Sequence, residues 1–185
     1  MRIIAGIARS VPLITPEGFE TRPTSDKVKE TLFNMLQGYI EGTTFLDLFA
    51  GSGQIGCEAL SRGAKEAVFV DQGSDPINCI KHNVDKIKMS DKAKIMKMEA
   101  LSALRTCEAE KLKIDVIFMD PPYGKLLEKG VLEYLSKSHL IDEDSLIIVE
   151  ADKWTDFDYL DSLGFTVVKE KRYKNNKHEF IRKTA

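Results

Sequence analysis

An aspartate, two prolines and a tyrosine directly follow an apolar run, and these residue types together suit the binding of a planar amine. The run is Val116 to Met119, and the tetrapeptide is Asp120-Pro121-Pro122-Tyr123. A carboxylate accepts hydrogen bonds from an NH2 group, an aromatic ring stacks on a flat base, and proline lacks an N–H donor. The same residues also form ordinary turns, so the tetrapeptide alone favours neither interpretation.

A glycine-rich segment upstream is the second place where residue types and spacing indicate ligand binding. Asp47-Leu48-Phe49-Ala50-Gly51-Ser52-Gly53-Gln54-Ile55-Gly56 carries the pattern GxGxxG between a predicted strand and a predicted helix. Glycines let the backbone turn tightly and approach a ligand closely. Asp71 ends the next predicted strand, where its carboxylate can bind ribose hydroxyls. Both NAD(P) and S-adenosylmethionine fit these features, because each carries an adenosine.

Short β-rich runs alternate with helical patterns from about residue 44 onward, which is typical of an α/β fold with a parallel sheet. Helices are predicted from Gly53 to Arg62 and from Ser74 onward. Ligands of such sheets bind outside the carboxyl ends of the strands, where Asp71 and Asp120 fall. The expected strands are 44–49, 66–71, 93–98, 115–119 and 145–150.

The C-terminal stretch predicts an antiparallel hairpin at the edge of this sheet. Its extended segments are 165–173 and 178–183, joined by Lys174-Asn175-Asn176-Lys177. From Lys169 to Lys183 seven Lys/Arg stand against two acids, a net charge of +5 in a chain whose total is −2. The positive charge is therefore concentrated at this end.

Residues 1–43 predict an N-terminal extension, and residues 44–185 the main domain. The extension should contain a short hairpin, 2–5 with 13–15, and a helix that begins near Asp26. The apolar residues on one face of that helix are Val28, Leu32, Phe33, Leu36 and Ile40.

Composition restricts the class of protein. The chain has 185 residues, 43% of them hydrophobic and 30% charged, as in a globular protein of one domain. No apolar run approaches the roughly 18 residues that span a bilayer. The apolar stretch at the N-terminus is too short for a secretory signal, so we expect a cytoplasmic protein. Three cysteines without CxxC spacing and three scattered histidines predict neither a metal site nor a disulfide.

The glycine-rich segment and the tetrapeptide together resemble those of Rossmann-like S-adenosylmethionine-dependent methyltransferases. The stretches Arg2–Gly6, Thr21–Asn34 and Gly56–Ala64 narrow the resemblance to the bacterial 16S ribosomal RNA (guanine-N2)-methyltransferase family, ribosomal RNA small subunit methyltransferase D. The resemblance covers nearly the whole chain. It implies a seven-stranded, mostly parallel sheet with helices on both faces, and S-adenosylmethionine as the methyl donor.

By that resemblance, the acceptor amine lies at Asp120, Pro121, Pro122 and Tyr123. The expected cofactor-binding residues are Asp47, Phe49, Ala50, Gly51, Ser52, Gly53, Asp71, Gln72, Glu99, Ala100 and Leu101. The expected substrate-binding residues are Arg9, Arg22, Thr24, Arg172, Lys174 and Lys177.

The implied reaction is methylation of a guanine N2 amine in 16S ribosomal RNA, within an assembled or assembling small-subunit particle, by a monomer without a metal. A DNA adenine-N6 methyltransferase remains an alternative, because an adenine amine makes the same demands on the tetrapeptide. A glutamine-N5 protein methyltransferase fits less well, since its motif usually begins with Asn. A non-catalytic S-adenosylmethionine-binding RNA module and a dehydrogenase also remain open.

Overall fold

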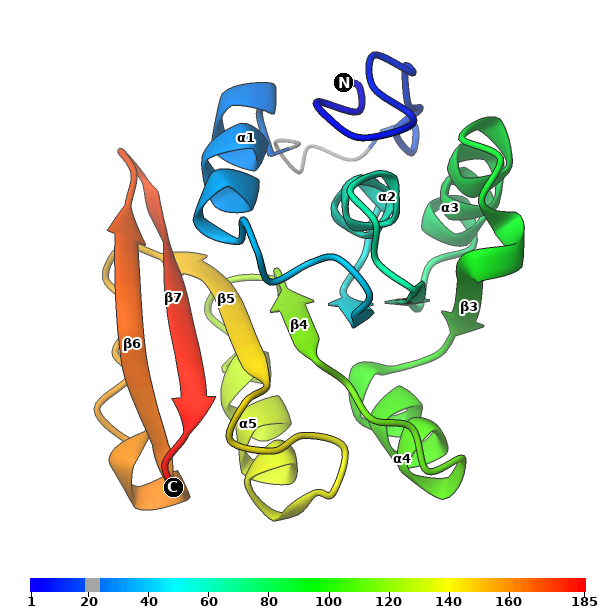
Figure 1. Ribbon diagram of the computed structural model, residues 1–185. Helices are drawn as coiled ribbons and strands as arrows, with labels where there is room; N and C mark the ends of the chain where they lie inside the picture. The colour runs from blue at the N-terminus through cyan, green and yellow to red at the C-terminus, as the bar shows by residue number, and fades with distance from the viewer. Residues whose placement is uncertain (19–23) are drawn as a thin grey trace.

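The computed structural model describes residues 1–18 and 24–185, and in this part of the chain the central element is a seven-stranded sheet (Figure 1). The strands are β1 Thr44–Leu48, β2 Glu66–Asp71, β3 Ala93–Lys97, β4 Val116–Met119, β5 Leu146–Asp152, β6 Phe165–Arg172 and β7 Asn176–Lys183. Their order is β3-β2-β1-β4-β5-β7-β6. The first five are parallel, and β7 is antiparallel to both of its neighbours, which confirms the predicted sheet.

β1 and β4 lie side by side at the point where the chain changes direction across the sheet. Both are buried along their whole length, as expected of apolar central strands in a parallel sheet. Leu48 pairs with Met119, so the residues that follow them emerge next to each other at the carboxyl edge. Such a switch point is where α/β sheets open a crevice for ligands.

Helices cover both faces of the sheet, as predicted. They are α1 Asp26–Met35, α2 Gln54–Ser61, α3 Ser74–Lys86, α4 Ala100–Ala109 and α5 Leu127–Lys137, with short 3-10 turns at Ser90–Lys92 and Asp161–Leu163. The first three share one hydrophobic cluster with one face of the sheet, and α4 and α5 share the other. In the described part of the chain, no helix is long and apolar enough to cross a membrane.

The N-terminal extension packs on α2, and the hairpin predicted there is present in a shortened form, with an antiparallel bridge between Arg2 and Pro12 flanked by hydrogen bonds from the Ile3 N–H to Val11 and from the Leu13 N–H to Met1. The reason is a competing acceptor. The backbone N–H groups of Ile4 and Ala5 donate to the carboxylate of Glu58 at 2.9–3.2 Å rather than to a partner strand. The helix prediction holds, since Ser25 caps α1 by accepting from the N–H three residues on.

A buried ion network fixes this extension to α2. The Lys29 ammonium group is fully buried, donates to the Arg2 carbonyl at 2.5 Å and lies 3.6 Å from Glu58, which also pairs with Arg62 at 2.9 Å. Burial lowers the pKa of Lys29, and Glu58 opposes the shift. Removing one partner of such a network leaves a buried charge without compensation, so the extension is held firmly.

The C-terminal hairpin is confirmed, with a shorter turn than the one predicted. β7 begins at Asn176 because Asn176 and Lys177 already pair with Asp152 and Ala151 of β5. β7 is thus an interior strand and β6 forms the edge, with a register shift between Val167 and Lys169.

Candidate active site

The glycine-rich loop follows β1 and turns through three left-handed residues, Phe49, Gly51 and Gly53, at φ 58°, 57° and 76°. A Cβ on Gly51 would meet nothing within 4 Å, so this glycine serves the turn and leaves its surroundings open. Gly53 serves both the turn and the packing of the loop, and Gly56 serves packing. A Cβ on Gly53 would lie 2.9 Å from an Ile80 atom, and one on Gly56 would lie 2.3 Å from the Phe69 ring.

Two carboxylates hold the shape of this loop from behind. Asp47 is buried and accepts from the Gly56 N–H at 3.0 Å, and burial raises its pKa well above the ordinary value. Asp71 accepts from the Gly51 N–H and the Gly73 N–H, both at 2.9 Å. Asp47 therefore lies beneath the loop, whereas Asp71 is half-buried at the carboxyl end of β2.

The remaining cofactor candidates gather at the same edge of the sheet. Gln72 is exposed beside Asp71, and Ser52 is buried with its carbonyl accepting from Asn83 at 2.9 Å. The Met98 N–H donates to the Asp71 carbonyl, which brings the end of β3 against the end of β2. Glu99 is exposed there as the residue before α4, and Ala100 and Leu101 form the first turn of that helix.

The tetrapeptide follows β4, beside the glycine-rich loop at the same carboxyl edge of the sheet. Pro121 is buried, Pro122 is exposed, and the Tyr123 side chain is 52% exposed, which leaves its ring accessible for stacking. Burial, and secondarily Glu150, raise the pKa of Asp120 to about 8. Burial and the neighbouring carboxylates also raise the pKa of Tyr123, which keeps its hydroxyl neutral.

Glu150, Asn176 and His178 are site residues that the sequence reasoning missed. Glu150 Oε1 accepts from the Asn176 amide at 2.8 Å, and Oε2 lies 2.9 Å from His178 Nε2. The His178 ring packs edge-on against Phe118 and Tyr173 at 5.9 and 5.2 Å between ring centroids. A signal for Glu150 existed in the sequence, because it is an acid at the end of the strand predicted to follow β4.

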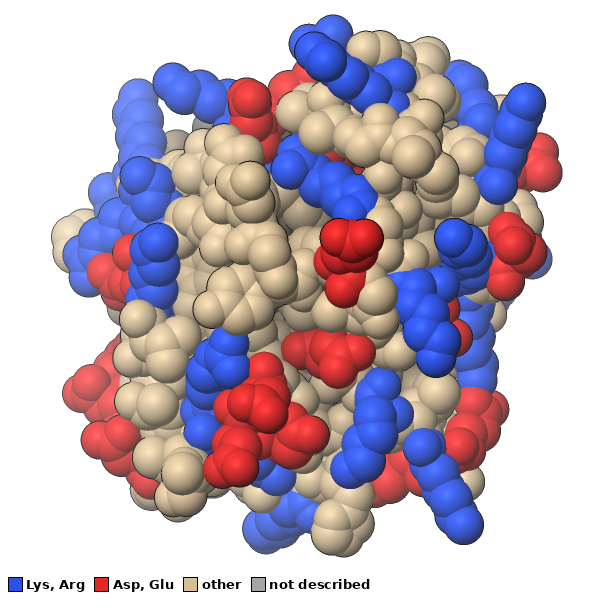
Figure 2. Space-filling view, in the orientation of Figure 1, with Lys and Arg blue, Asp and Glu red and all other residues tan. Residues whose placement is uncertain are grey.

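The substrate candidates lie in different surroundings. Arg172 and Lys174 are exposed near the end of the β6–β7 hairpin, and Figure 2 shows Lys and Arg side chains gathered at the upper left of the molecule, where Figure 1 places that end. Arg9 is exposed in the N-terminal extension, Thr24 is partly buried just before α1, and Arg22 lies outside the described residues.

Lys177 differs from the other substrate candidates. It is buried, with its ammonium group 2.8 Å from Glu179 and 3.3 Å from Glu170. Two carboxylates therefore already neutralise the charge that we expected to meet RNA.

Comparison with known proteins gives consistent matches. The model of the family described as conserved hypothetical protein 95 matches residues 1–182. The ribosomal RNA small subunit methyltransferase D of Haemophilus influenzae is 37% identical over 92% of this chain and 88% of that protein. YlbH of Bacillus subtilis is 38% identical over 83% of each chain. The solved structure of yhhF from Escherichia coli has a TM-score of 0.85 and 29% identity, covering 100% of this chain and 98% of that one.

Proposed function

This chain belongs to the conserved hypothetical protein 95 family, and we propose that it methylates the exocyclic N2 amine of a guanine in small-subunit ribosomal RNA. It is an rRNA methyltransferase of that family, and S-adenosyl-L-methionine is its methyl donor. One observation carries the proposal. The open glycine loop follows β1 and the Asp120 carboxylate, whose pKa is raised, follows the adjacent strand β4.

The residues after β1, β2 and β3 fit the methyl donor. The left-handed turn at Gly51 leaves open space beside the loop, and the Asp71 carboxylate keeps lone pairs for ribose hydroxyls after accepting two backbone N–H groups. Glu99, Ala100 and Leu101 stand one strand further along, where an adenine would extend. When bound, S-adenosylmethionine supplies a methyl group on a sulfonium sulfur, whose C–S bond breaks as the new C–N bond forms.

The residues after β4 bind and orient the acceptor amine. The guanine N2 lone pair is delocalised into the ring, so the amine must be held with that lone pair directed at the methyl group. In this proposal the Asp120 carboxylate and the Pro121 carbonyl each accept a hydrogen bond from the amine, and Tyr123 stacks on the base. Because the pKa of Asp120 is near 8, its carboxylate is a better proton acceptor than an ordinary aspartate, and it takes the proton that the amine loses.

The target base must be extruded from a helix or lie in a loop, since the amine has to enter the crevice. The protein has a net charge of −2 and an exposed basic hairpin, so its overall charge attracts free RNA only weakly. We therefore propose that the substrate is a folded, protein-bearing small-subunit particle in the cytoplasm. We also propose that the protein acts as a monomer, because the glycine loop and the tetrapeptide follow adjacent strands of one sheet.

Purified protein should be incubated with labelled S-adenosylmethionine and small-subunit particles from cells that lack the gene. The label should appear on one guanine, located by mass spectrometry of nuclease fragments as N2-methylguanine. Deproteinised RNA and an adenine-containing DNA duplex serve as controls and should accept far less label. Labelling of the DNA at a comparable rate, or of another atom in the RNA, would disprove the proposed specificity.

A further inference from the structure

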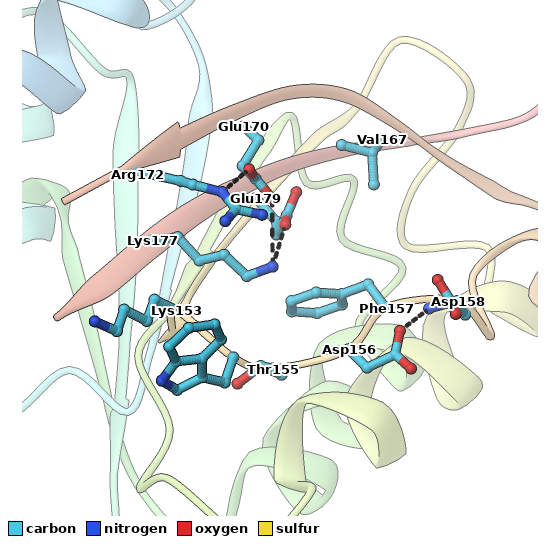
Figure 3. Close-up of a pocket in the computed structure, with 11 residues that line it drawn as sticks. Lys153, Thr155, Asp156, Phe157, Asp158, Val167, Glu170, Arg172, Lys177 and Glu179 are labelled. Carbon is cyan, nitrogen blue, oxygen red and sulfur yellow. Dashed lines mark hydrogen bonds and ion pairs between the residues drawn. The ribbon is translucent and has the colours of Figure 1, made fainter. Parts of the chain in front are cut away.

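A hollow of about 490 Å³ lies between the β6–β7 hairpin and the segment that follows β5, and the proposed active site does not use it (Figure 3). Its volume is within the roughly 300–1,000 Å³ typical of ligand pockets. We propose that this hollow binds a second base of the same RNA, a guanine, stacked on Trp154 and bound by the carboxylates of Glu170 and Glu179. The inference rests on the proposed function for the identity of the substrate as RNA.

The hollow adjoins the acceptor side of the active site. Side chains alternate between the two faces of a strand. On β7, Asn176 and His178 contact Glu150 on one face, and Lys177 and Glu179 line the hollow on the other. One RNA strand that passes over the start of β7 would therefore reach both places.

Trp154 provides the stacking surface. It is 79% exposed, which is costly for an indole ring in water, and Lys153 Nζ lies 5.0 Å from the ring centroid. Its backbone is fixed, since the Trp154 N–H donates to Asp152 at 2.9 Å. A base that stacks on the ring would remove that apolar surface from water, a contact that tolerates any base and so needs a second feature for selectivity.

The carboxylates of Glu179 and Glu170 provide the selectivity. Glu179 is 3% exposed, and its Oε2 atom has no hydrogen-bond partner among the described residues. An unsatisfied buried acceptor of this kind is expensive and favours a ligand that donates. Figure 3 shows the Glu170 and Glu179 carboxyl groups close together above Phe157, with Lys177 bonded to both.

Guanine matches this arrangement better than the other bases. Its Watson–Crick edge carries N1–H and N2–H2 side by side, which a carboxylate accepts together, and O6 next to them can accept from Lys177. Adenine, cytosine and uracil do not present two adjacent donor groups. Burial, and next the neighbouring Glu170, raise the pKa of Glu179 to about 7, so the buried charge of its ionised form is only partly compensated within the chain, and the donor groups of a base would add to that compensation.

A cationic side chain of a ribosomal protein is the rival occupant. The hollow is lined by three cations, Lys153, Arg172 and Lys177, and by four acids, Asp156, Asp158, Glu170 and Glu179, so its net charge does not favour RNA. The two glutamates that would attract an arginine already pair with cations of the chain itself, Glu170 with Arg172 and Lys177, and Glu179 with Lys177. The preference for a base therefore rests on the exposed Trp154 ring and on the adjoining acceptor side.

The test uses the chain's only tryptophan, Trp154, as a fluorescent reporter in the intact protein. Stacking should quench it, and GMP should do so at lower concentration than AMP, CMP or UMP. Glu179→Gln should keep the quenching and lose the preference for GMP, and the exposed Glu143→Gln should behave as the unmodified protein. Asp120→Ala should also leave quenching unchanged, because Asp120 belongs to the active site.

A second measurement does not depend on the fluorescence of Trp154. Trp154→Ala should bind a labelled guanine-containing trinucleotide roughly 5- to 140-fold more weakly by anisotropy, the range for loss of one base stack. This side chain is exposed, so the variant should keep its melting temperature. If Glu179→Gln lowers the melting temperature, Glu170→Gln on the edge strand β6 should be used in its place, with the same expected loss of the preference for GMP.

Two results would overturn the inference: equal or absent quenching by the four nucleotides, or quenching by an arginine-rich peptide alone. Guanine-selective quenching in a protein that methylates no RNA would support the hollow and overturn the proposed function. Methylation of the RNA without guanine-selective quenching would support the proposed function and overturn the binding of guanine in the hollow.

Discussion

The two halves of the proposed site, after β1 and β2 on one side and after β4 on the other, use their carboxylates in opposite ways. On the glycine-loop side, Asp47 and Asp71 accept hydrogen bonds from backbone N–H groups of the chain itself, so the loop is preformed. On the acceptor side, burial and Glu150 act on Asp120, and no hydrogen-bond donor of the described residues lowers its pKa. The carboxylates on the glycine-loop side already accept hydrogen bonds within the protein, whereas Asp120 accepts one only when a donor group such as an amine binds.

The largest effect on methyl transfer should follow removal of the Asp120 carboxylate. Asp120→Ala should reduce kcat/KM for methyl transfer by about 10²–10⁴-fold, the range for removal of a positioned acid–base group, and leave the Kd for S-adenosylmethionine unchanged. Single-turnover transfer and calorimetry would measure the two quantities. If both fell in equal measure, the division between the two sides would be wrong.

Asp71→Ala should have the converse effect. It removes the acceptor proposed for the ribose hydroxyls, and because one hydrogen bond to a charged group is worth about 1.5–3 kcal/mol, the Kd for S-adenosylmethionine should rise by at least roughly tenfold. Transfer at saturating cofactor should change much less. Calorimetry that finds an unaltered affinity would exclude Asp71 from the cofactor side.

Gly56→Ala tests whether the loop is held by packing. The new Cβ would lie 2.3 Å from the Phe69 ring, and overpacking of this kind costs about 1–3 kcal/mol in the free energy of unfolding. Gly130→Ala on α5 is the matched control, because its Cβ meets nothing within 4 Å, and it should gain about 0.5–1 kcal/mol in a helix. Equal urea midpoints for the two variants would contradict the packing argument.

The acceptor side should impose a pH dependence on activity. Only ionised Asp120 accepts both the hydrogen bond and the proton, so kcat/KM should rise with pH, with a midpoint near the Asp120 pKa of about 8, and then level off. Glu150→Gln removes the neighbouring negative charge, which makes ionisation of Asp120 easier and moves the midpoint to lower pH. A midpoint that stays in place would mean that Glu150 does not act on Asp120.

The same raised pKa has a cost in stability. An unfolded aspartate ionises near pH ~3.9, whereas folded Asp120 keeps its proton to about pH 8, so its contribution to the free energy of unfolding is complete at low pH and is lost as pH rises through that window. Asp120→Asn should remove this part of the pH dependence.

The smallest effect is expected at the basic hairpin. Arg172→Ala and Lys174→Ala should each reduce the slope of log affinity against log salt by about 1 for RNA binding, with only a modest change in affinity. Lys65→Ala, at an exposed lysine before β2 and separated from the hairpin by β1, β4 and β5, should leave the slope unchanged. An equal effect at Lys65 would indicate non-specific attraction alone.

The strands and the glycine loop were predictable because their signals are local. Apolar runs marked β1 and β4, and the pattern GxGxxG marked the turn between β1 and α2. The structure adds which glycine serves which purpose, and this depends on Phe69 and Ile80, which lie on other elements.

The non-local contacts were not predictable from the sequence. The roles of Glu150 and His178 depend on the insertion of β7 between β5 and β6, and no short pattern encodes strand order. The shortening of the N-terminal hairpin has the same origin, since Glu58 on α2 accepts from the N–H groups of Ile4 and Ala5, which the predicted pairing included. The prediction of Lys177 as a substrate contact could not take account of its two carboxylate partners, which lie on β6 and β7.

The position of β7 inside the sheet also sets an order of events during translation. The glycine loop, Asp71 and Glu99 are all made before residue 100, whereas Glu150 waits for Asn176 and His178, which leave the ribosome with the last strand. Chains are synthesised at about 5–20 residues per second, so several seconds separate the two events. During synthesis the residues of the proposed cofactor side are therefore complete before those of the proposed acceptor side, which come together only when β7 pairs with β5.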